Sequence, residues 1–511
     1  MQNNQSHSVK DLAWLQSELG ALLQQNLSDN LVGSDLPNKI NDLNLDSRRV
    51  KAGDVFIALS GFNVHGLEFA IEAEKAGAIA VVVESVESMS EDSKKCLKLL
   101  SIPVIKCNDL SAVLGELASA FYDRPSQKMH VTAITGTNGK TSTAWLLMYA
   151  LEQLGVKVGY MGTLGIGGIS GLKKTANTTP SAIVIQKNLA AMISAGYEHV
   201  CMEVSSHALD QKRLNGTEIQ SAVFTNLTRD HLDYHHTMQA YADAKLKLFK
   251  DFAPSISVIN GDDEVGASWL DRELFNQSTV SYGVKNKSVH FKASNIKLLT
   301  SGITFELDLA GKSFVLNTSL LGAFNVENTL AVIAILEALG YPINQISSAV
   351  ARLQPVPGRM NRVDDVPNDV LVVVDYAHTP DALLQVLKSL RAHALNCLWC
   401  VFGCGGNRDK GKRSIMGEIA EQHADQVVLT DDNPRFESSI QIISDIKKGM
   451  KNEPHVINNR KQAIAYVLNN SKSGDVVLLA GKGHESTQEI NGKLIPFNDT
   501  NVVKQLIKVA V

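Results

Sequence analysis

The chain has 511 residues, of which 44% are hydrophobic and 20% charged, with a net charge of -4 at pH 7. A chain of this length predicts about three domains rather than one core. The charge balance argues against a surface built to bind a nucleic-acid backbone, and no stretch reaches the roughly 18 apolar residues of a membrane span. The polar N-terminus lacks a signal-peptide core and the 6 cysteines are scattered, which favours a cytoplasmic location.

The first part of the chain, residues 1–125, predicts a small α/β domain. Apolar runs at 54–59 and 78–85 predict strands, and the pattern at 67–77 between them is helical. Polar residues around Pro125 interrupt this pattern before the next apolar run begins. We therefore place the first domain boundary after residue 125.

Residues 126–353 predict a central nucleotide-binding domain. A strand, a glycine loop and a helix open this segment, and further apolar strands alternate with helices, as in a parallel sheet that helices cover. The prolines of 354–369 end the pattern. Beyond the boundary, residues 354–511 again alternate between apolar strands and helices, which predicts a Rossmann-like doubly wound domain. The expected fold class is therefore α/β with three domains.

The sharpest motif is the phosphate loop, which has the sequence TGTNGKT at 135–141 between a strand and a helix. Its glycines let backbone N–H groups approach phosphate oxygens, and the helix N-terminus adds the positive end of its dipole. Lys140 supplies a charge and the Thr141 hydroxyl can reach Mg²⁺. A common P-loop has its first glycine at the position of Ile134, so this motif is a variant. A plain glycine turn with an exposed lysine is the weaker interpretation, because strand, loop and helix coincide.

Glu203 and His231 each follow an apolar strand in the central segment. The carboxyl ends of strands are where open α/β sheets bind ligands, so both side chains are candidates to converge beside the phosphate loop as magnesium ligands. A structural ion pair is the alternative for Glu203. His235 and His236 are expected to lie in a solvated loop rather than in a zinc site.

A set of motifs occurs in order across nearly the whole chain, and it comprises TGTNGKTS, NTTP, EVSSHAL, TNLTRDHLDYH, LGAFNVEN, PGRM, DYAHTP, FGCGGNRDKGKR, DDNPR and AGKGHE. As an ordered set these motifs resemble the Mur ligase family, and most of all its diaminopimelate-adding members. The resemblance implies ATP-dependent joining of meso-2,6-diaminopimelate to the D-glutamate of UDP-N-acetylmuramoyl-L-alanyl-D-glutamate through an acyl phosphate, in peptidoglycan precursor synthesis. It implies Mg²⁺ as cofactor, ATP as co-substrate and only small-molecule substrates as partners.

The resemblance also implies roles for individual residues. The expected catalytic residues are Lys140, Glu203, His231 and Lys245. The expected magnesium ligands are Thr141, Glu203, His231 and Lys245, the last after carbamylation to N6-carboxylysine. The expected ATP contacts are Gly136, Thr137, Asn138, Gly139, Lys140, Thr141, Ser142, Asn325, Arg359, Asp375 and His378. The expected contacts to the UDP substrate are Leu45, Ser47, Phe62, Asn63, Val64, Asn177, Thr178, Thr179, Ser205, Gln211 and Arg213. The expected diaminopimelate contacts are Arg408, Asp432, Asn433, Pro434, Arg435, Gly481 and Glu485.

Some of these residues have a second interpretation. By composition alone, Lys245 is an ordinary solvated helical lysine. Asn325 and Asp375 suit capping or turn duty equally well. The planar guanidinium of Arg435 suits the extra carboxylate that distinguishes diaminopimelate from lysine, whereas an isolated arginine there would cap a helix or pair with Glu437.

Two other classes of function stay open. A lysine-adding ligase of the same family, or more distantly a folylpolyglutamate-synthase-like ligase, would differ mainly in the amino-acid pocket and in the first domain. A nucleotide-binding regulator would keep the fold without turnover. The complete set of Lys140, Glu203, His231 and Lys245 argues against that regulator.

Overall fold

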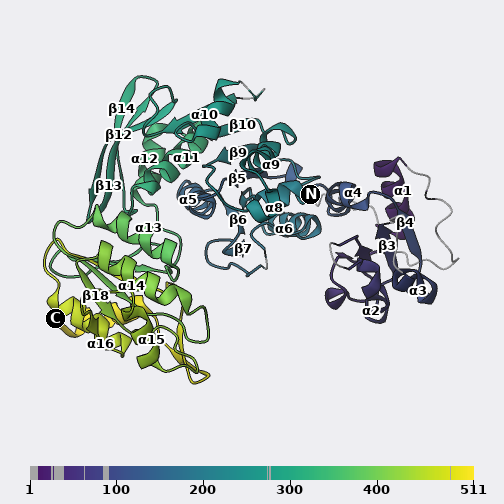
Figure 1. Ribbon diagram of the computed structural model, residues 1–511. Coiled ribbons are helices and arrows are strands. Elements are labelled where there is room, and N and C mark those ends of the chain that lie inside the picture. The colour runs from purple at the N-terminus through teal and green to yellow at the C-terminus, as the bar shows by residue number, and fades with distance from the viewer. Residues whose placement is uncertain are drawn as a thin grey trace.

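The computed structural model describes residues 10–24, 27, 39–61, 64–84, 91–175, 177–272, 274–275, 278–483 and 485–510. These residues form sheets of 4, 10 and 6 strands in chain order, and a 2-stranded hairpin near the C-terminus. Figure 1 shows the first sheet at one side of the central one and the last sheet at another side. The predicted α/β fold with three domains is confirmed. Among the described helices, none combines the length and apolar character that a membrane crossing demands.

The first sheet is parallel throughout, in the order β1-β2-β3-β4. Its strands are β1 (Leu43–Asn44), β2 (Val55–Ala58), β3 (Ala80–Glu84) and β4 (Val104–Cys107), and its helices are α1 (Leu12–Leu23), α2 (Ala70–Lys75), α3 (Glu91–Leu99) and α4 (Leu110–Phe121). The strands bury nearly every side chain because helices cover both faces. Helix α4 packs against α6 (Ala182–Ser194) of the central domain, which attaches the first domain there.

The central sheet has the order β14-β13-β12-β11-β10-β9-β5-β8-β6-β7. Its strands are β5 (His130–Thr135), β6 (Val158–Gly162), β7 (Gly165–Gly167), β8 (His199–Glu203), β9 (Ser221–Phe224), β10 (Ile256–Asn260), β11 (Ser278–Gly283), β12 (Phe291–Leu299), β13 (Gly302–Leu309) and β14 (Lys312–Thr318). The expected parallel sheet extends from β6 to β12, but β7, β13 and β14 are antiparallel. The last two strands alternate between buried and exposed residues, which marks a sheet with one solvated face.

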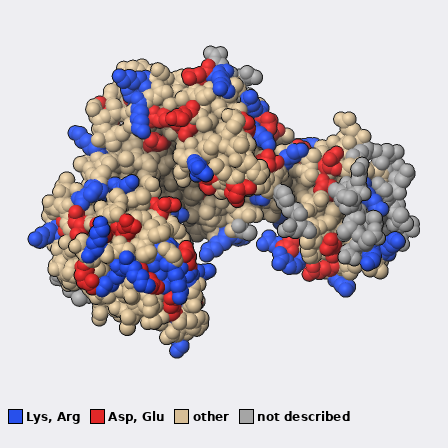
Figure 2. Space-filling model, viewed as in Figure 1, with Lys and Arg blue, Asp and Glu red and all other residues tan. Residues whose placement is uncertain are grey.

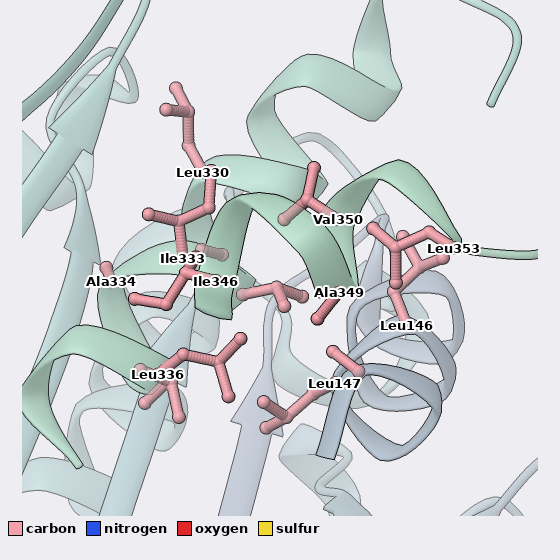
Figure 3. Packing of buried hydrophobic residues seen from close by; sticks show 14 of the residues in the cluster. Leu146, Leu147, Leu330, Ile333, Ala334, Leu336, Ile346, Ala349, Val350 and Leu353 are labelled. Atoms are coloured by element: carbon pink, nitrogen blue, oxygen red, sulfur yellow. The ribbon is translucent and has the colours of Figure 1, made fainter. Parts of the chain in front are cut away.

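Two layers of helices cover the central sheet. The remaining helices of this domain are α5 (Lys140–Gln153), α7 (Ser206–Asp210), α8 (Leu232–His235), α9 (Met238–Lys250), α10 (Glu264–Asp271), α11 (Phe324–Ala338) and α12 (Ile343–Ala351). Figure 3 shows Leu146 and Leu147 of α5, Leu330 and Ile333 of α11 and Ile346 of α12 meeting in one cluster. This packing buries α11 on almost all sides, so that helix is apolar all round. It also holds α5, which follows the phosphate loop, rigidly against the sheet.

The third sheet has the order β15-β16-β20-β17-β18-β19, with only β15 antiparallel to its neighbour. Its strands are β15 (Asn361–Val363), β16 (Leu371–Asp375), β17 (Leu398–Phe402), β18 (Gln426–Leu429), β19 (His455–Val456) and β20 (Val476–Ala480), and the hairpin is β21 (Thr487–Ile490) with β22 (Lys493–Pro496). Its helices are α13 (Pro380–Arg391), α14 (Gly411–His423), α15 (Ser439–Lys447), α16 (Arg460–Asn470) and α17 (Asp499–Ala510). Separate apolar clusters lie on its two faces, as a doubly wound domain requires.

The connections between the three units are short. Helix α4 ends at Phe121 and β5 begins at His130, while α12 ends at Ala351 and β15 begins at Asn361. The boundaries at 125 and 353 stay predictions. Figure 2 shows the first domain joined to the rest by a narrow link, and a recess between the central and third domains. A cleft described below is lined by residues of both of these domains.

Candidate active site

The phosphate loop connects β5 to α5 and needs glycine at two positions. Gly136 and Gly139 have φ angles of +151° and +84°, in the range that favours glycine. A Cβ added to Gly136 would lie 1.9 Å from the Oγ1 atom of Thr225. That hydroxyl instead donates a hydrogen bond to the carbonyl of Asn138 at 2.6 Å. The loop is therefore fixed by the strand beside it, and not by its own sequence alone.

The segment after β9 holds the rest of the loop. The backbone N–H of Asn138 donates to Oδ1 of Asn226 at 2.9 Å, and Nδ2 of Asn226 donates back to the Asn138 carbonyl at 3.2 Å. The Thr228 N–H donates to Oγ1 of Thr137 at 3.0 Å. These contacts hold the loop in one conformation before any anion binds. An anion therefore does not have to order the loop when it binds.

Lys140 is half-buried at the first position of α5. Its Nζ atom donates to the carbonyls of Gly136 at 2.9 Å and Thr137 at 2.8 Å. Burial lowers the pKa of Lys140, whereas the charges of Glu203 and Asp230 raise it. The side chain thus lies along the loop, which contradicts the alternative of a glycine turn with an exposed lysine.

Glu203 ends β8 and has no exposed surface. Its carboxylate accepts hydrogen bonds from the hydroxyl of Thr141 at 2.7 Å, the N–H of Thr163 at 2.9 Å and the hydroxyl of Tyr160. In the described part of the chain no lysine, arginine or histidine forms an ion pair with this carboxylate, so the structural ion-pair alternative is wrong. Hydroxyl and carboxylate oxygens are the ligands that Mg²⁺ prefers, and this pair of side chains fits such an ion.

Lys245 is a buried lysine on α9, with 1% of its surface exposed. Its Nζ donates to the Gly136 carbonyl at 2.8 Å and lies 4.4 Å from the ring centre of Tyr241. Burial, and then the charge of Lys140, lower the pKa of Lys245 to about 6. The interpretation as an ordinary solvated lysine is wrong, because α9 packs this position against the phosphate loop. This lowered pKa favours the neutral amine over the ammonium.

His231 lies at the edge of the same region. Its φ angle is +52°, its side chain is 44% exposed, and its Nε2 lies 3.4 Å from Oδ2 of Asp230. Its ring centre lies 5.9 Å from that of Tyr241, the ring that also contacts Lys245. Within the described ranges, no three histidine, cysteine, aspartate or glutamate side chains converge as metal ligands. A cation here would therefore need oxygens from elsewhere.

His235 differs from the expectation. It is only 7% exposed, and its Nε2 lies 2.9 Å from Oγ of Ser206. His235 is the last residue of the short helix α8 and packs against Ser206 of α7 and Tyr241 of α9. The prediction of a solvated loop is therefore wrong for His235. His236 is exposed, as expected.

A cleft of about 360 Å³ lies between the phosphate loop and the third domain. It is lined by residues of both domains, among them Thr137, Asn138, Gly139, Lys140, Thr141, Ser142, Arg359 and Asp375. Asp375 ends β16, and its carboxylate accepts from the N–H groups of Met360 and Ala377, both at 2.7 Å. Burial raises its pKa. The Asp375 side chain thus stabilises the turn after β16 and also lines the cleft.

Three expected ATP contacts, Gly136, Asn325 and His378, are not among the residues that line this cleft. Asn325 is buried, donates to the Leu321 carbonyl at 2.7 Å and lines a smaller adjoining cavity of about 30 Å³. Its contacts are those of a helix-start residue. His378 lies 2.9 Å from the Tyr376 carbonyl through Nδ1 and lines the pocket of the third domain described below.

Residues expected to contact the muramoyl peptide gather behind Glu203. Thr179 donates to the Glu203 carbonyl at 2.8 Å and accepts from the Ser205 N–H at 3.0 Å. Arg213 donates to the Thr179 carbonyl at 2.8 Å and to Oε1 of Gln211 at 3.0 Å. Nearby, the hydroxyls of Thr178 and Thr163 are 3.1 Å apart, and Asn177 is exposed.

Residues expected to contact uridine lie in the first domain. Ser47 is buried and donates to Oε2 of Glu72 at 2.8 Å, which is a structural contact. Leu45 is half-buried and Val64 is 43% exposed. Phe62 and Asn63 lie outside the described residues. This group is distant from the phosphate loop along the chain, and Figure 1 shows its sheet apart from the central one.

A second pocket of about 330 Å³ lies at the carboxyl ends of the third sheet. It brings together nearly all the residues expected to bind diaminopimelate, namely Arg408, Asp432, Asn433, Arg435, Gly481 and Glu485. Pro434 is not on the wall. Its carbonyl lies so close to Gly406 that a Cβ there would be 1.9 Å away, so it shapes the loop instead.

Arg435 has a φ of +53° and two side-chain partners. Its Nε donates to Oε2 of Glu489 at 2.9 Å and its Nη1 donates to the Gly406 carbonyl at 2.8 Å. The alternative pairing with Glu437 is wrong, because Glu437 pairs with the buried Arg413 at 2.8 Å. Hairpin β21–β22 supplied the actual partner, which no local pattern could have indicated.

Two lysines near this pocket were missed. Lys412 lines it and donates to the His378 carbonyl at 2.6 Å. Lys482 is fully buried behind it. Lys412 lies in the motif FGCGGNRDKGKR and Lys482 in AGKGHE. The position of Lys482 between two glycines after an apolar strand was the sequence signal that could have indicated a site residue.

Comparisons with known proteins agree along the chain. Residues 39–122 match the model described as "Mur ligase family, catalytic domain", residues 134–336 match "Mur ligase middle domain", and residues 358–483 match "Mur ligase, glutamate ligase domain". Together these matches cover more than half of the chain.

Individual relatives are similar over almost their whole length. The UDP-N-acetylmuramoyl-L-alanyl-D-glutamate–2,6-diaminopimelate ligase of Haemophilus influenzae is 42% identical over 483 residues, covering 93% of this chain and 98% of that protein. The ligase of the same name from Coxiella burnetii is 42% identical over 474 residues, with coverages of 92% and 96%. A solved structure of a ligase of this name has a TM-score of 0.75 at 35% identity, with coverages of 96% and 99%. The MurF ligase of Thermotoga maritima in complex with ADP, at 18% identity and a TM-score of 0.55, shares the fold.

Proposed function

The chain belongs to the Mur ligase family, and we propose that it joins meso-2,6-diaminopimelate to the D-glutamate of UDP-N-acetylmuramoyl-L-alanyl-D-glutamate with ATP, in the cytoplasm. The observation that carries this proposal is the pocket of the third domain. Its wall holds two guanidinium groups, Arg408 and Arg435, the ammonium of Lys412, and three carboxylates, Asp409, Asp432 and Glu485. Such a wall complements an amino acid with carboxylates and ammonium groups at both ends.

Ligation needs an activated carboxylate, because a free carboxylate is a poor acylating agent. In the proposed reaction the terminal phosphoryl group of ATP moves to the glutamate carboxylate, and the acyl phosphate is then attacked by the amine, which releases phosphate. The phosphate loop and Lys140 would hold the phosphates, and the N-terminus of α5 would favour their charge. Catalysis would rest on positioning and on charge stabilisation.

Thr141 and Glu203 would hold Mg²⁺, which supplies positive charge against the phosphates when it is bound. A second ion would use His231 and a carbamylated Lys245. The neutral amine of Lys245 supports this assignment, since only an unprotonated amine adds CO₂ to form a carbamate. The change replaces a buried amine by an anion at the end of a long arm, beside the loop.

The first domain would hold the UDP end of the substrate through the region of Leu45, Ser47 and Val64. Asn177, Thr178, Thr179, Ser205, Gln211 and Arg213 would lead the peptide end toward Glu203. Arg359 and Asp375 would contact the nucleotide from the third domain, so that movement of this domain would close the site and exclude water from the acyl phosphate.

A panel of amino acids tests this proposal. The protein is incubated with ATP, Mg²⁺, the UDP-muramoyl dipeptide and, in separate reactions, meso-diaminopimelate, lysine or glutamate, and phosphate release and the product mass are measured. We expect a product with diaminopimelate and a rate lower by about 10⁴ with lysine, because lysine lacks the second carboxylate that Arg408 and Arg435 would bind. Equal use of lysine would favour the lysine-adding alternative, and no turnover with any amino acid would favour the non-catalytic regulator.

A further inference from the structure

The loop after β20 carries a lysine whose side chain has no exposed surface, Lys482. Its Nζ lies 3.0 Å from Oδ1 of Asn433, 3.0 Å from Oε2 of Glu485 and 3.4 Å from Oδ1 of Asp432. These oxygens come from two loops that are about fifty residues apart in sequence, one after β18 and one after β20. Burying an ammonium group is costly unless it is paired, and this one contacts two carboxylates and one amide oxygen.

The contacts of Asn433 show what Lys482 achieves. Oδ1 of Asn433 accepts from Lys482 and from the N–H of Glu489 at 2.9 Å, which decides which end of the amide is the oxygen. Nδ2 of Asn433 then donates to Oε2 of Glu485 at 3.0 Å. That same oxygen accepts from Lys482, so the three side chains form a closed triangle. The triangle fixes the direction of the Glu485 carboxylate on the pocket wall.

Two carboxylates, those of Asp432 and Glu485, lie beside the one ammonium group of Lys482. The neighbouring Arg460 is neutralised by Asp499, which accepts from it at 2.8 and 2.7 Å. Burial raises the pKa of Asp432, and Lys482 and Arg460 lower it. Two oriented carboxylates on the wall of the pocket suit an ammonium group.

We propose that Lys482 is a positioning residue of the amino-acid pocket, which keeps Glu485 and Asp432 ionised and oriented to bind the ammonium group of the incoming amino acid. This inference rests on the proposed function. Because its side chain is wholly buried, Lys482 acts through Glu485, Asn433 and Asp432 rather than by touching the substrate.

The role has a consequence for pH dependence. Without the Lys482 ammonium, two carboxylates would share a buried site, and repulsion and burial would raise their pKa values. Part of the pair would then be protonated near neutral pH and would lose its attraction for an ammonium. Other charged or titratable groups surround the pair, and Lys482→Met leaves them in place. They are Asp431, Arg460, Asp499, Arg435 and Glu489, and, on the same pocket wall, His378, Arg408, Asp409 and Lys412.

The test compares the KM for diaminopimelate in the unmodified protein and in Lys482→Met between pH 6.5 and 9. At pH 7 we expect the variant to raise this KM by about 10- to 100-fold, and to recover most of the loss at pH 9 as the carboxylates ionise. The kcat and the KM for ATP should change by less than about twofold. Lys448→Met, which removes an exposed lysine of the same domain, is the control and should change nothing.

Two results would overturn the proposal. One is an unchanged KM in a folded Lys482→Met, and the other is a raised KM that stays constant with pH, which would indicate a merely structural role. If the variant does not fold, the unmodified protein decides, because its KM should stay constant down to pH 6.5, and a steep rise below pH 7 would show that the carboxylates are not kept ionised. If the unmodified protein rejects diaminopimelate, the proposed function fails, and the same comparison is run with the amino acid that the panel identifies.

Discussion

The phosphate loop and the amino-acid pocket are built in different ways. The loop is one continuous segment, 135–141, between a strand and a helix, and neighbouring side chains hold it from outside. The pocket is assembled from four segments of the third domain, around residues 376–378, 405–412, 432–435 and 481–485. A short motif can specify the first arrangement, whereas only the tertiary fold can bring the second together.

The two regions also differ in how they handle charge. Near the loop, two lysines, Lys140 and Lys245, share the Gly136 carbonyl, while the buried Glu203 has hydroxyl partners. In the pocket, some charged groups form ion pairs, as in Arg435 with Glu489 and Lys482 with Glu485. The loop region thus leaves charged groups available to external anions and cations, whereas ion pairs already orient charged groups of the pocket. Variants in each region should therefore fail in different ways.

The largest effect is expected at the loop, from Lys140→Ala. The loss of one preorganised charge contact typically lowers turnover by about 10² to 10³, so phosphate release should nearly vanish. The fold should persist, because Nζ of Lys140 bonds only to carbonyls of its own loop. Phosphate release measures turnover, and a thermal unfolding curve measures whether the fold persists. Lys157→Ala, at an exposed lysine of the same domain, should remain active, and near-normal turnover by a folded Lys140→Ala would contradict the role of the loop.

Lys245→Ala should be nearly as severe. The site needs an anion at the end of the arm, so added bicarbonate should not restore activity, whereas a short carboxylic acid should restore part of it. Lys250→Ala, on the exposed end of the same helix, is the matched control. A Lys245→Arg variant as active as the unmodified protein would rule out a carbamate, because a guanidinium stays positively charged.

The pH dependence of Lys245 gives an independent check. Its lowered pKa of about 6 makes the amine neutral above that pH and an ammonium below it, and the ammonium cannot add CO₂. With ¹³C-bicarbonate, a carbamate signal should therefore be visible by NMR at pH 7.5 and should fade as the pH drops through about 6. A signal that is absent at every pH would sink the assignment.

The sequence alone predicted the fold class, the phosphate loop and the strand-end position of Glu203, because these depend on apolar runs and on local spacing. It missed the antiparallel strands β13 and β14, since their half-exposed alternation is weaker than a continuous apolar run. It placed His235 in solvent and offered Glu437 as the partner of Arg435. Both errors concern contacts between segments that are not neighbours in the chain, and periodicity carries no information on those.

The central claim is that the phosphate loop binds ATP and the pocket of the third domain binds the amino acid. The most direct test is to measure the KM for diaminopimelate and the KM for ATP in Arg435→Ala. Each hydrogen bond to a charged group contributes about 1.5 to 3 kcal/mol, so the KM for diaminopimelate should rise by at least about tenfold and the preference over lysine should narrow. The KM for ATP should stay within about twofold, because the nucleotide cleft does not include Arg435. An unchanged KM for diaminopimelate, or equal rises in both KM values, would contradict the account.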